Sequence, residues 1–507
     1  MLSPAGPKRP SVATKVAFGF GSTAEAIALT AVGGYAMFYY NQILGLPATL
    51  SGLAMTASVF FDGFLDPLIG SISDRTRSRL GRRHPFMFAA PIPAAICLWA
   101  VFNPPDVLPA AWLFTWFLGF VVSLKVVLSV YQVPHLALGG ELSSDYAERT
   151  RVMSYSNFMG AIGTTATSFV ALSLFFGATT EYPRGLLNPA GYAPFGVAAA
   201  LTLLALHILC AVTTARQIPN LKQPGPETAT FRPMDFIRDM RAAFSNRNYV
   251  FLLVAVFFLA LMVGLRGAMN LYINTFFWEL TSEQIRWFAF SNLAGFFVSF
   301  LASARLHEAF DKRRAMVACA VLLGVVPAIP VVLRAAGLFP DPGTPLLVPV
   351  IMLFGALQAA IGSVLSISVL SALADIADQN ELRFGVRQEG VLYSTRAVFA
   401  KLDSAIGVLL AGIAIDLAGL PRGATPGEVE AEVIWTLAII DGPLAVVPGL
   451  LAALFYARYR IDKASHALTR AGLERLHGGA SEPGVTVAAG IAGAAASLRD
   501  TNPATPS

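Results

Sequence analysis

Long apolar segments alternate with short polar segments along most of the chain, and few charged residues interrupt the apolar ones. A helix needs about 20 apolar residues to cross the hydrocarbon core of a bilayer. Segments of roughly that length lie near residues 16–41, 49–73, 86–103, 110–133, 152–176, 194–214, 248–278, 284–304, 315–336, 346–374, 388–420 and 433–458. The pattern therefore predicts an all-α membrane protein with twelve membrane-spanning helices.

Basic residues are concentrated in every second polar segment. The segments on the side of both termini hold basic clusters, whereas the alternate segments hold only Arg184 and Arg422. Cytoplasmic loops of membrane proteins carry an excess of lysine and arginine. We therefore expect both termini to be cytoplasmic and the protein to lie in the plasma (inner) membrane.

The composition agrees with a membrane protein and argues against other classes. Only 13% of the residues are charged, against about 25% in a soluble domain. The cytoplasmic loops explain the net charge of +5, so we expect no nucleic-acid partner. No nucleotide-binding, metalloprotease or hydrolase motif occurs in a suitable context, so we expect no enzyme activity and no cofactor.

A break after the sixth apolar segment divides the chain. Residues 215–247 form the longest cytoplasmic segment, which includes a stretch rich in proline and glycine, QPGPETATFRP. We predict a six-helix bundle in residues 1–214, a cytoplasmic loop at 215–247 and a second six-helix bundle in residues 248–460. Residues 461–507 would form a cytoplasmic tail that begins as a charged helix and is otherwise largely disordered. Many membrane carriers consist of two such repeats with a site between them.

Two aspartates lie inside the second apolar segment, in the stretch FDGFLDPLIG. Asp62 and Asp66 are one helical turn apart and therefore project from one face. Charge within a membrane helix usually faces a cavity or an ion path. Two carboxylates in such a place can bind a proton or a hard cation. Alternatively, Asp66 with Pro67 breaks the helix, or one aspartate pairs with a neighbouring helix.

Three loop motifs carry a family resemblance. DPLIGSISDRTRSRLGRRHPF, QVPHLALGGELSSDYAERTR and ADIADQNELRFGVRQEGVLYS occur in this order. Together they resemble the signature of the glycoside–pentoside–hexuronide:cation symporters, the melibiose-permease branch of the major facilitator superfamily. The resemblance implies the major facilitator fold, with two six-helix bundles, and a carrier of sugars or related solutes driven by a cation.

The same resemblance assigns a coupling site. Asp62 and Asp66 match the aspartates that hold the coupling cation, Ser129 matches a hydroxyl on helix four, and Lys401 matches a lysine on helix eleven. Lys125 lies one turn before Ser129, where the family has a small residue. A lysine there would disfavour sodium and favour proton exchange. The alternative is that Lys125 forms a purely structural bridge with Glu25.

Substrate contacts are predicted from several polar residues in apolar segments. Glu25 resembles, with an offset of one, a sugar-binding carboxylate of the family, and Gln132 can hydrogen-bond to hydroxyls. Arg266, Asn270 and Asn274 recur every four residues in the seventh segment. Arg266 either binds an anionic group of the substrate or pairs with another helix, with Asp403 as one candidate. Asp403 and Arg396 are seven residues apart, hence on one helical face, with Lys401 pointing elsewhere.

Gating is predicted for the charged residues of two cytoplasmic loops. They would form salt bridges between helix ends that latch the outward-facing state, or they would only set the topology and meet lipid phosphates. These residues are Asp74, Arg75, Arg82, Arg83, Glu141, Arg149 and Arg151.

The sequence thus predicts a secondary active transporter, acting as a monomer among membrane lipids. It would move a sugar, glycoside or sugar acid together with a cation by alternating access, with protons slightly favoured over sodium. One alternative is a sodium-coupled lysolipid carrier of the same branch. The other is a membrane sensor that transports nothing, although a sensor has no reason to keep two aspartates and two lysines within the membrane.

Overall fold

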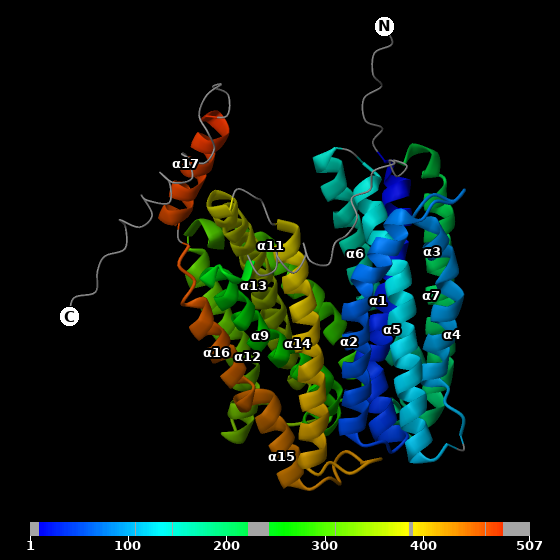
Figure 1. Cartoon of the computed structure of the whole chain (residues 1–507). Helices are drawn as coiled ribbons and strands as arrows, with labels where there is room; N and C mark the ends of the chain where they lie inside the picture. The colour runs from blue at the N-terminus through cyan, green and yellow to red at the C-terminus, as the bar shows by residue number, and fades with distance from the viewer. Residues whose placement is uncertain are drawn as a thin grey trace, which may run out of the picture.

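The computed structural model describes residues 10–106, 108–143, 145–221, 243–309, 311–384, 389–461 and 463–479. Helices form two groups that stand side by side, one from each half of the chain (Figure 1). Within the described residues, eleven helices are long and apolar enough to cross a membrane. These observations agree with the predicted all-α membrane fold.

The N-terminal half consists of six spans. The first span contains π-helical turns at Val32–Ala36 and Tyr39–Ile43, and the fifth span ends in one at Ala171–Phe175. The helices are α1 (Val12–Ala31), α2 (Ala48–Arg75), α3 (His84–Ala89) with α4 (Pro91–Phe102), α5 (Ala110–Glu141), α6 (Tyr146–Val170) and α7 (Tyr192–Ala215).

The C-terminal half follows the same plan. Its helices are α9 (Arg247–Tyr272), α10 (Ser282–Ile285), α11 (Phe288–Ala309), α12 (Lys312–Ala335), α13 (Leu347–Phe384), α14 (Glu389–Leu417), and α15 (Ala431–Ile439) with α16 (Val446–Tyr456). α11 lies at the eighth predicted span and packs against α13, although it is not among the eleven helices selected by length and composition. A further helix, α17 (Lys463–Gly479), begins the predicted tail.

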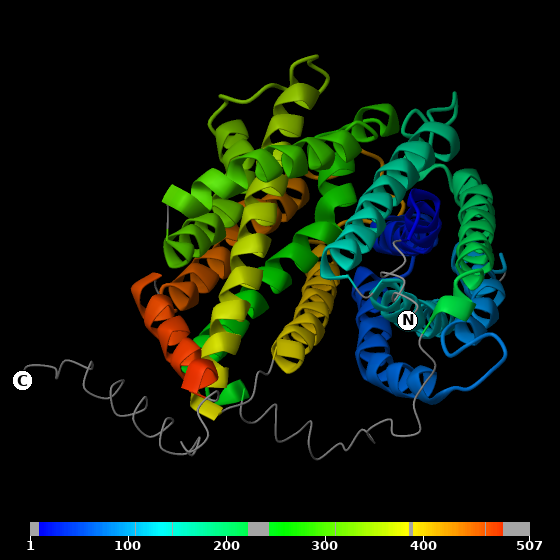
Figure 2. The ribbon, with the colours of Figure 1, turned by 90° about the horizontal axis from the view of Figure 1, so that it is seen from above.

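Helix packing repeats with an offset of six spans. In the first half, α1 packs against α6 and α7, α2 against α5, and α4 against α5 and α7. In the second half, α9 packs against α14 and α16, α11 against α13, and α12 against α13 and α16. The halves meet where α2 contacts α14 and where α6 contacts α11 (Figure 2). The site that couples the halves should therefore lie along these two contacts.

The repeat extends to single residues at the ends of the first and seventh spans. The π-helical turns Tyr39–Ile43 and Ile273–Phe277 are each closed by a backbone hydrogen bond, from Leu44 to Tyr39 and from Trp278 to Ile273. The next residue has a positive φ in both halves, 75° at Gly45 and 52° at Glu279. The two turns therefore correspond residue by residue.

Two predicted helix ends differ from the structure. The fourth and tenth spans continue as α5 and α13 to Glu141 and Phe384, so much of the second and third loop motifs is helical. Polar residues add turns beyond the membrane, because a helix can continue into water once its apolar part has crossed. α2 also continues through Pro67, which removes the helix-break explanation for Asp66. Most of the predicted loop at 215–247 and the tail beyond 479 lie outside the described residues, so the domain boundaries stay predictions.

Hydrogen bonds between the halves gather at the end of the bundle opposite α17. Tyr272 donates to the Met37 carbonyl at 3.3 Å, and the backbone N–H groups of Ala48 and Thr49 donate to Asp416 at 3.0 and 2.7 Å. Further bonds there join Ala178 to Glu283, Leu186 to Ser282, Arg184 to Thr275 and Ala424 to Gln42. This end of the bundle is held closed.

Candidate functional site

A cluster of charged side chains joins the two halves within the membrane-spanning helices. Lys401 of α14 lies 3.0 Å from Asp62 Oδ2 and 2.9 Å from Asp66 Oδ2 of α2. Ser129 of α5 donates a hydrogen bond to Asp62 Oδ1. The predicted coupling residues Asp62, Asp66, Ser129 and Lys401 are thus brought together, and their lysine comes from the opposite half of the chain.

The cluster lies beside a cavity between the halves, which we call the central cavity. Its volume is about 570 Å³, within the range of small-molecule sites. α1, α2, α5 and α14 supply its walls, which are mainly apolar. The polar lining residues are Ser58, Asp62, Lys125, Arg396, Lys401 and Ser404.

Lys125 is close to the cluster without joining it. It lines the central cavity and lies within electrostatic range of Asp62, Glu25, Asp66 and Lys401. Among the described residues it makes no ion pair, so the predicted structural bridge to Glu25 is not formed. Lys125 therefore keeps its hydrogen-bond donors free for a solute, for water or for one of the carboxylates.

Two negative charges thus share one lysine. The Asp62 side chain is 9% exposed and that of Asp66 is 27% exposed, whereas Lys401 is 41% exposed. Asp66 Oδ1 is buried and has no hydrogen-bond partner in the described part of the chain. Because a buried carboxylate needs a proton or a positive partner, a cation that reaches this cluster competes with Lys401. Such competition would loosen a contact between α2 and α14.

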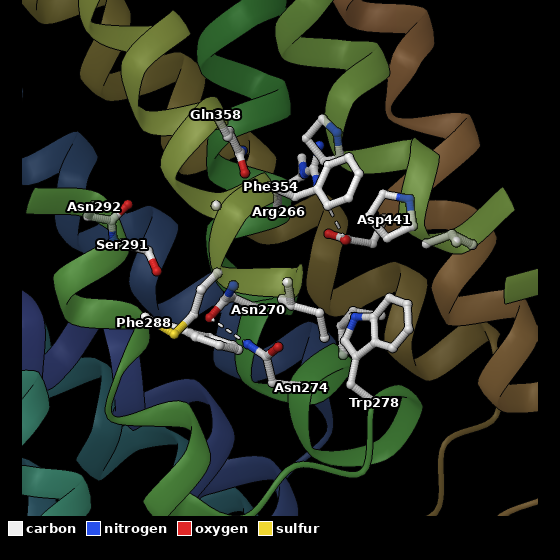
Figure 3. Close-up of a pocket in the computed structure, with 17 residues that line it drawn as sticks. Arg266, Asn270, Asn274, Trp278, Phe288, Ser291, Asn292, Phe354, Gln358 and Asp441 are labelled. Carbon is white, nitrogen blue, oxygen red and sulfur yellow. Dashed lines mark hydrogen bonds and ion pairs between the residues drawn. The ribbon is translucent and has the colours of Figure 1, made fainter. Parts of the chain in front are cut away.

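A second cavity lies within the C-terminal half, and we call it the C-terminal pocket. Its volume is about 190 Å³, and residues of α9, α11, α12, α13 and the turn after α15 line it (Figure 3). Arg266 faces Asp441 across 3.6 Å, and Asn274 donates a hydrogen bond of 3.2 Å to Asn270. The remaining polar lining residues are Trp278, Ser291, Asn292 and Gln358.

The predicted substrate residues are divided by the structure. Arg266, Asn270 and Asn274 line the C-terminal pocket, but Glu25 and Gln132 lie in α1 and α5 of the other half and line neither described cavity. The five residues therefore do not form one binding site in this conformation. The predicted alternative for Arg266, an ion pair with another helix, is observed, but the partner is Asp441 and not the candidate Asp403.

The predicted faces of α14 also need correction. Arg396 and Lys401 both line the central cavity, whereas Asp403 is buried away from it with Oδ2 unpartnered among the described residues. Seven residues place Arg396 and Asp403 at the same angle but about 10 Å apart along the helix. Arg396 and Lys401 flank a broad face made of small residues, and their length lets both reach the cavity.

The predicted gating residues form bridges within the N-terminal half. Arg82 and Arg83 lie 2.8 and 2.9 Å from Glu141, and Arg83 also pairs with Asp74. Arg151 pairs with Glu148 of its own helix at 2.5 Å. Arg75 and Arg149 are exposed. These bridges clamp helix ends of one half, and a latch between the halves is therefore not formed by them in this conformation.

The C-terminal half has a similar clamp. Lys312, at the start of α12, lies 2.7 Å from Asp375 near the end of α13, and His466 of α17 lies 3.3 Å from the same aspartate. The clamp joins the start of the third helix of this half to the fourth helix. In the first half, Arg82 and Arg83 lie just before the third helix and pair with Glu141 at the end of the fourth. α17 is thereby attached to the C-terminal half.

Sequence reasoning missed several residues of the C-terminal pocket. Asp441 is a lone carboxylate in an apolar span, and this signal could have identified it as a cavity or ion-pair residue. Ser291, Asn292 and Gln358 gave no such signal, because neutral polar residues are common in membrane helices.

Comparisons with known proteins cover most of the chain. The family described as MFS/sugar transport protein matches residues 17–463. A relative from Escherichia coli (strain K12), named putative glycoside/cation symporter YagG, is 26% identical over 90% of this chain and 93% of its own length. The sodium-dependent lysophosphatidylcholine symporter 1 of Gallus gallus is 23% identical over 92% of this chain and 90% of its own length. The crystal structure of a D-xylose-proton symporter shares the fold, with a TM-score of 0.59, 12% identity and coverage of 88% of this chain and 97% of that one.

Proposed function

Because the chain belongs to the MFS/sugar transport protein family, we propose that it is a secondary transporter that couples the movement of a sugar-like solute to that of a cation. The family match covers residues 17–463, and it confirms both the family expected from the three loop motifs and the absence of an enzymatic role. The coupled cation and the class of solute are the parts that we infer from the site.

The bridge between the halves is the observation that carries this proposal. Lys401 of one half contacts Asp62 and Asp66 of the other within 3.0 Å. A cation that neutralises these carboxylates removes the partner of Lys401, and the contact between α2 and α14 weakens. Binding of the cation is thereby linked to rocking of the two halves, which is how carriers of this plan alternate access.

The occupied oxygens favour a proton over sodium. Ser129 and Lys401 already donate to three of the four aspartate oxygens, which leaves few ligands for a metal ion. Hard metal cations need several oxygen ligands at once. Lys125 adds a second positive charge near the site, which raises the electrostatic cost of a sodium ion. A proton needs only one carboxylate oxygen, and Asp66 Oδ1 has no other partner among the described residues.

The hydrogen bonds between the halves indicate which side of the membrane is closed in this conformation. If the termini are cytoplasmic, as the loop charges indicate, the hydrogen bonds opposite α17 close the periplasmic side. The structure then does not represent the outward-facing state of a plasma-membrane carrier, because its periplasmic side is closed. The clamps at the cytoplasmic end stay within their own halves and can persist while the halves move apart.

Transport in proteoliposomes tests the choice of cation. We expect D-xylose or methyl β-glycoside uptake to follow a pH gradient and to ignore sodium at fixed pH and membrane potential. Lys125→Ala should gain stimulation by sodium, whereas Lys125→Arg, which keeps the charge, should not. Strong sodium stimulation of the unmodified protein would contradict proton coupling. Uptake that responds to neither gradient would contradict coupled transport altogether.

A lysolipid carrier is the second candidate, because the walls of the central cavity are mainly apolar. An acyl chain could lie against residues such as Leu29, Val121 and Val408. The relative from Gallus gallus is named as a lysophosphatidylcholine symporter. Lysophosphatidylcholine that competes with sugar uptake below its micellar concentration would favour this candidate, and a lack of competition would remove it.

A further inference from the structure

We propose that the C-terminal pocket binds a single ring of a neutral, polyhydroxylated solute, so that solute recognition and cation coupling lie in different halves of the molecule. This inference rests on the proposed transport function. It names the class of solute and adds Asp441, Gln358 and Trp278 to the residues expected to recognise it. It also excludes an acidic sugar as the preferred ligand of this pocket.

Comparison with the N-terminal half shows that the pocket is not a general feature of the fold. By the correspondence of the two π-helical turns, Asn274 occupies the position of Tyr40, and Asn270 that of Ala36. Tyr40 is fully buried and stacks on Phe117 with ring centroids 3.9 Å apart. Where one half fills this position with packed rings, the other keeps open space lined by amides.

Several polar groups that line the C-terminal pocket have unused hydrogen-bonding capacity. Arg266 Nη1 and Ser291 Oγ are buried, and neither has a hydrogen-bond partner among the described residues. The distance of 3.6 Å between Arg266 and Asp441 is too long for a hydrogen bond, so the aspartate also keeps acceptor capacity. Buried polar groups without a hydrogen-bond partner are costly within a membrane protein. A ligand with several hydroxyl groups, or water in its absence, would satisfy them.

The charge balance selects a neutral ligand. Arg266 and Asp441 are the charged residues that line the pocket, and their charges cancel. A carboxylate placed beside the guanidinium would also lie close to Asp441 and be repelled by it. Hydroxyl groups, in contrast, can donate to Asp441 and accept from Arg266 at the same time.

The amides and the aromatic wall complete the match to a sugar ring. Asn270, Asn274, Asn292 and Gln358 offer both donors and acceptors, as vicinal hydroxyls require. Figure 3 shows Trp278 on one side of the pocket, where its ring can cover the apolar C–H face of a sugar. Asn270 and Asn292 keep exposed surface, whereas Asn274 and Trp278 are buried, so the first pair marks the entrance.

The size of the pocket limits the ligand to one ring. The pocket has about one third of the volume of the central cavity, about 190 Å³ against about 570 Å³. This space suits a monosaccharide or the terminal ring of a glycoside. A whole disaccharide or an acyl chain would need the larger central cavity.

Equilibrium binding to the full-length protein in detergent tests the site. The probes are D-xylose, D-glucose, their single-deoxy analogues and D-glucuronate, measured by calorimetry. We expect a neutral sugar to bind, and Asn274→Ala and Gln358→Ala to weaken its binding about tenfold, the effect of one or two lost hydrogen bonds. Each variant should lose little affinity for the deoxy analogue that lacks the matching hydroxyl. A merely structural role would weaken all probes equally and would overturn the inference.

Selectivity between sugar and sugar acid provides a second test. Asp441→Asn leaves Arg266 without a counter-charge, so D-glucuronate should gain affinity relative to D-glucose. If Asp441→Asn does not fold, the binding of the deoxy analogues to Asn274→Ala still tests whether the pocket binds the sugar. Asn157→Ala, an exposed position on α6, is the matched control and should bind all probes normally. D-glucuronate binding more tightly than the neutral sugars to the unmodified protein, or no neutral sugar binding at all, would overturn the inference.

Transport measurements separate this inference from the proposed function. Sugar uptake that follows a cation gradient with a KM unchanged by Asn274→Ala would leave the function standing and reject the pocket. Sugar binding that depends on Asn274, without any coupled uptake, would support the pocket and reject the coupled function.

Discussion

The two halves of the molecule share one helix arrangement but use corresponding positions differently. At the end of the first span, Tyr40 packs between helices and donates a hydrogen bond of 2.8 Å to the Val101 carbonyl. At the end of the seventh span, Asn274 lines an open pocket with Arg266. The N-terminal half instead places carboxylates, Asp62 and Asp66, where it meets the other half.

The difference shows that a repeated backbone can separate two tasks. At Tyr40 the N-terminal half gains aromatic packing, since a ring pair adds about 0.5–1.5 kcal/mol beyond its buried area. At the corresponding position the C-terminal half has the amide of Asn274 in place of a ring, which keeps hydrogen-bonding groups available. Lys401 is the element of the second half that reaches the carboxylates of the first, so it is the physical link between the tasks.

The largest expected effect comes from removing a coupling carboxylate. Asp62→Asn or Asp66→Asn should abolish accumulation of solute against a gradient, because an amide can neither carry a proton nor neutralise a cation. Exchange of solute down its gradient can survive, since the C-terminal pocket is intact. Uptake and counterflow in proteoliposomes measure the two activities. Full accumulation of solute by both variants would show that Asp62 and Asp66 do not couple transport to a cation.

Exchanging corresponding side chains tests the comparison directly. Tyr40→Asn should destabilise the protein by roughly 3–5 kcal/mol, the scale for losing a buried aromatic side chain. The substitution opens a cavity against Phe117 and removes the hydrogen bond to Val101. Asn274→Tyr should instead fill the C-terminal pocket, with a much smaller loss of stability. Thermal unfolding in detergent measures both, and equal losses would mean that Asn274 is as structural as Tyr40.

A smaller effect is expected where the halves differ in backbone strain. Gly45 has a φ of 75°, and a Cβ there would meet open space, so Gly45→Ala tests the backbone alone. We expect a loss of about 1–2 kcal/mol, the cost of left-handed backbone for an L-residue. Glu279 already has this strain at a φ of 52° and holds Arg184 at 3.3 Å in return. Glu279→Gly should therefore gain backbone freedom and lose an ion pair, with a net change near zero in the same unfolding assay.

The smallest effect concerns pH at the closed end. Burial opposes ionisation of Glu283. Hydrogen bonds from the N–H groups of Ala178 and of Glu283 itself, with further contributions from Thr281 and the charge of Arg286, together outweigh burial and lower the pKa of the carboxyl below its usual value of 4.5. A lowered pKa means that the ionised group stabilises the fold above about pH 4.5 and that this contribution is lost as the pH falls further. The unfolding temperatures of the unmodified protein and of Glu283→Gln should therefore converge on acidification. A difference between the two unfolding temperatures that grows toward low pH would contradict the lowered pKa of Glu283.

Sequence alone predicted the fold and much of the coupling site for identifiable reasons. Apolar runs have the length that the bilayer requires, and loop charges follow from the cost of moving them across it. Asp62 and Asp66 stood out because ionised groups in apolar runs are costly and therefore rare. The partner of Arg266 could not be chosen, because Asp403 and Asp441 are both lone acids in apolar spans and only packing distinguishes them.

The sequence by itself determined which helices form, that two aspartates and two lysines lie within the membrane, and that the chain is a carrier. The helices and the membrane charges follow from local composition and periodicity, whereas the carrier function follows from the resemblance of three loop motifs to a family of carriers. Only the tertiary structure decided that Lys401 bridges both aspartates, that Lys125 stays unpaired among the described residues, and that Arg266 and Asn274 line a pocket apart from Glu25 and Gln132. These facts depend on how helices far apart in the chain rotate and cross, because a side chain's partner is set by the neighbouring helix and not by its own.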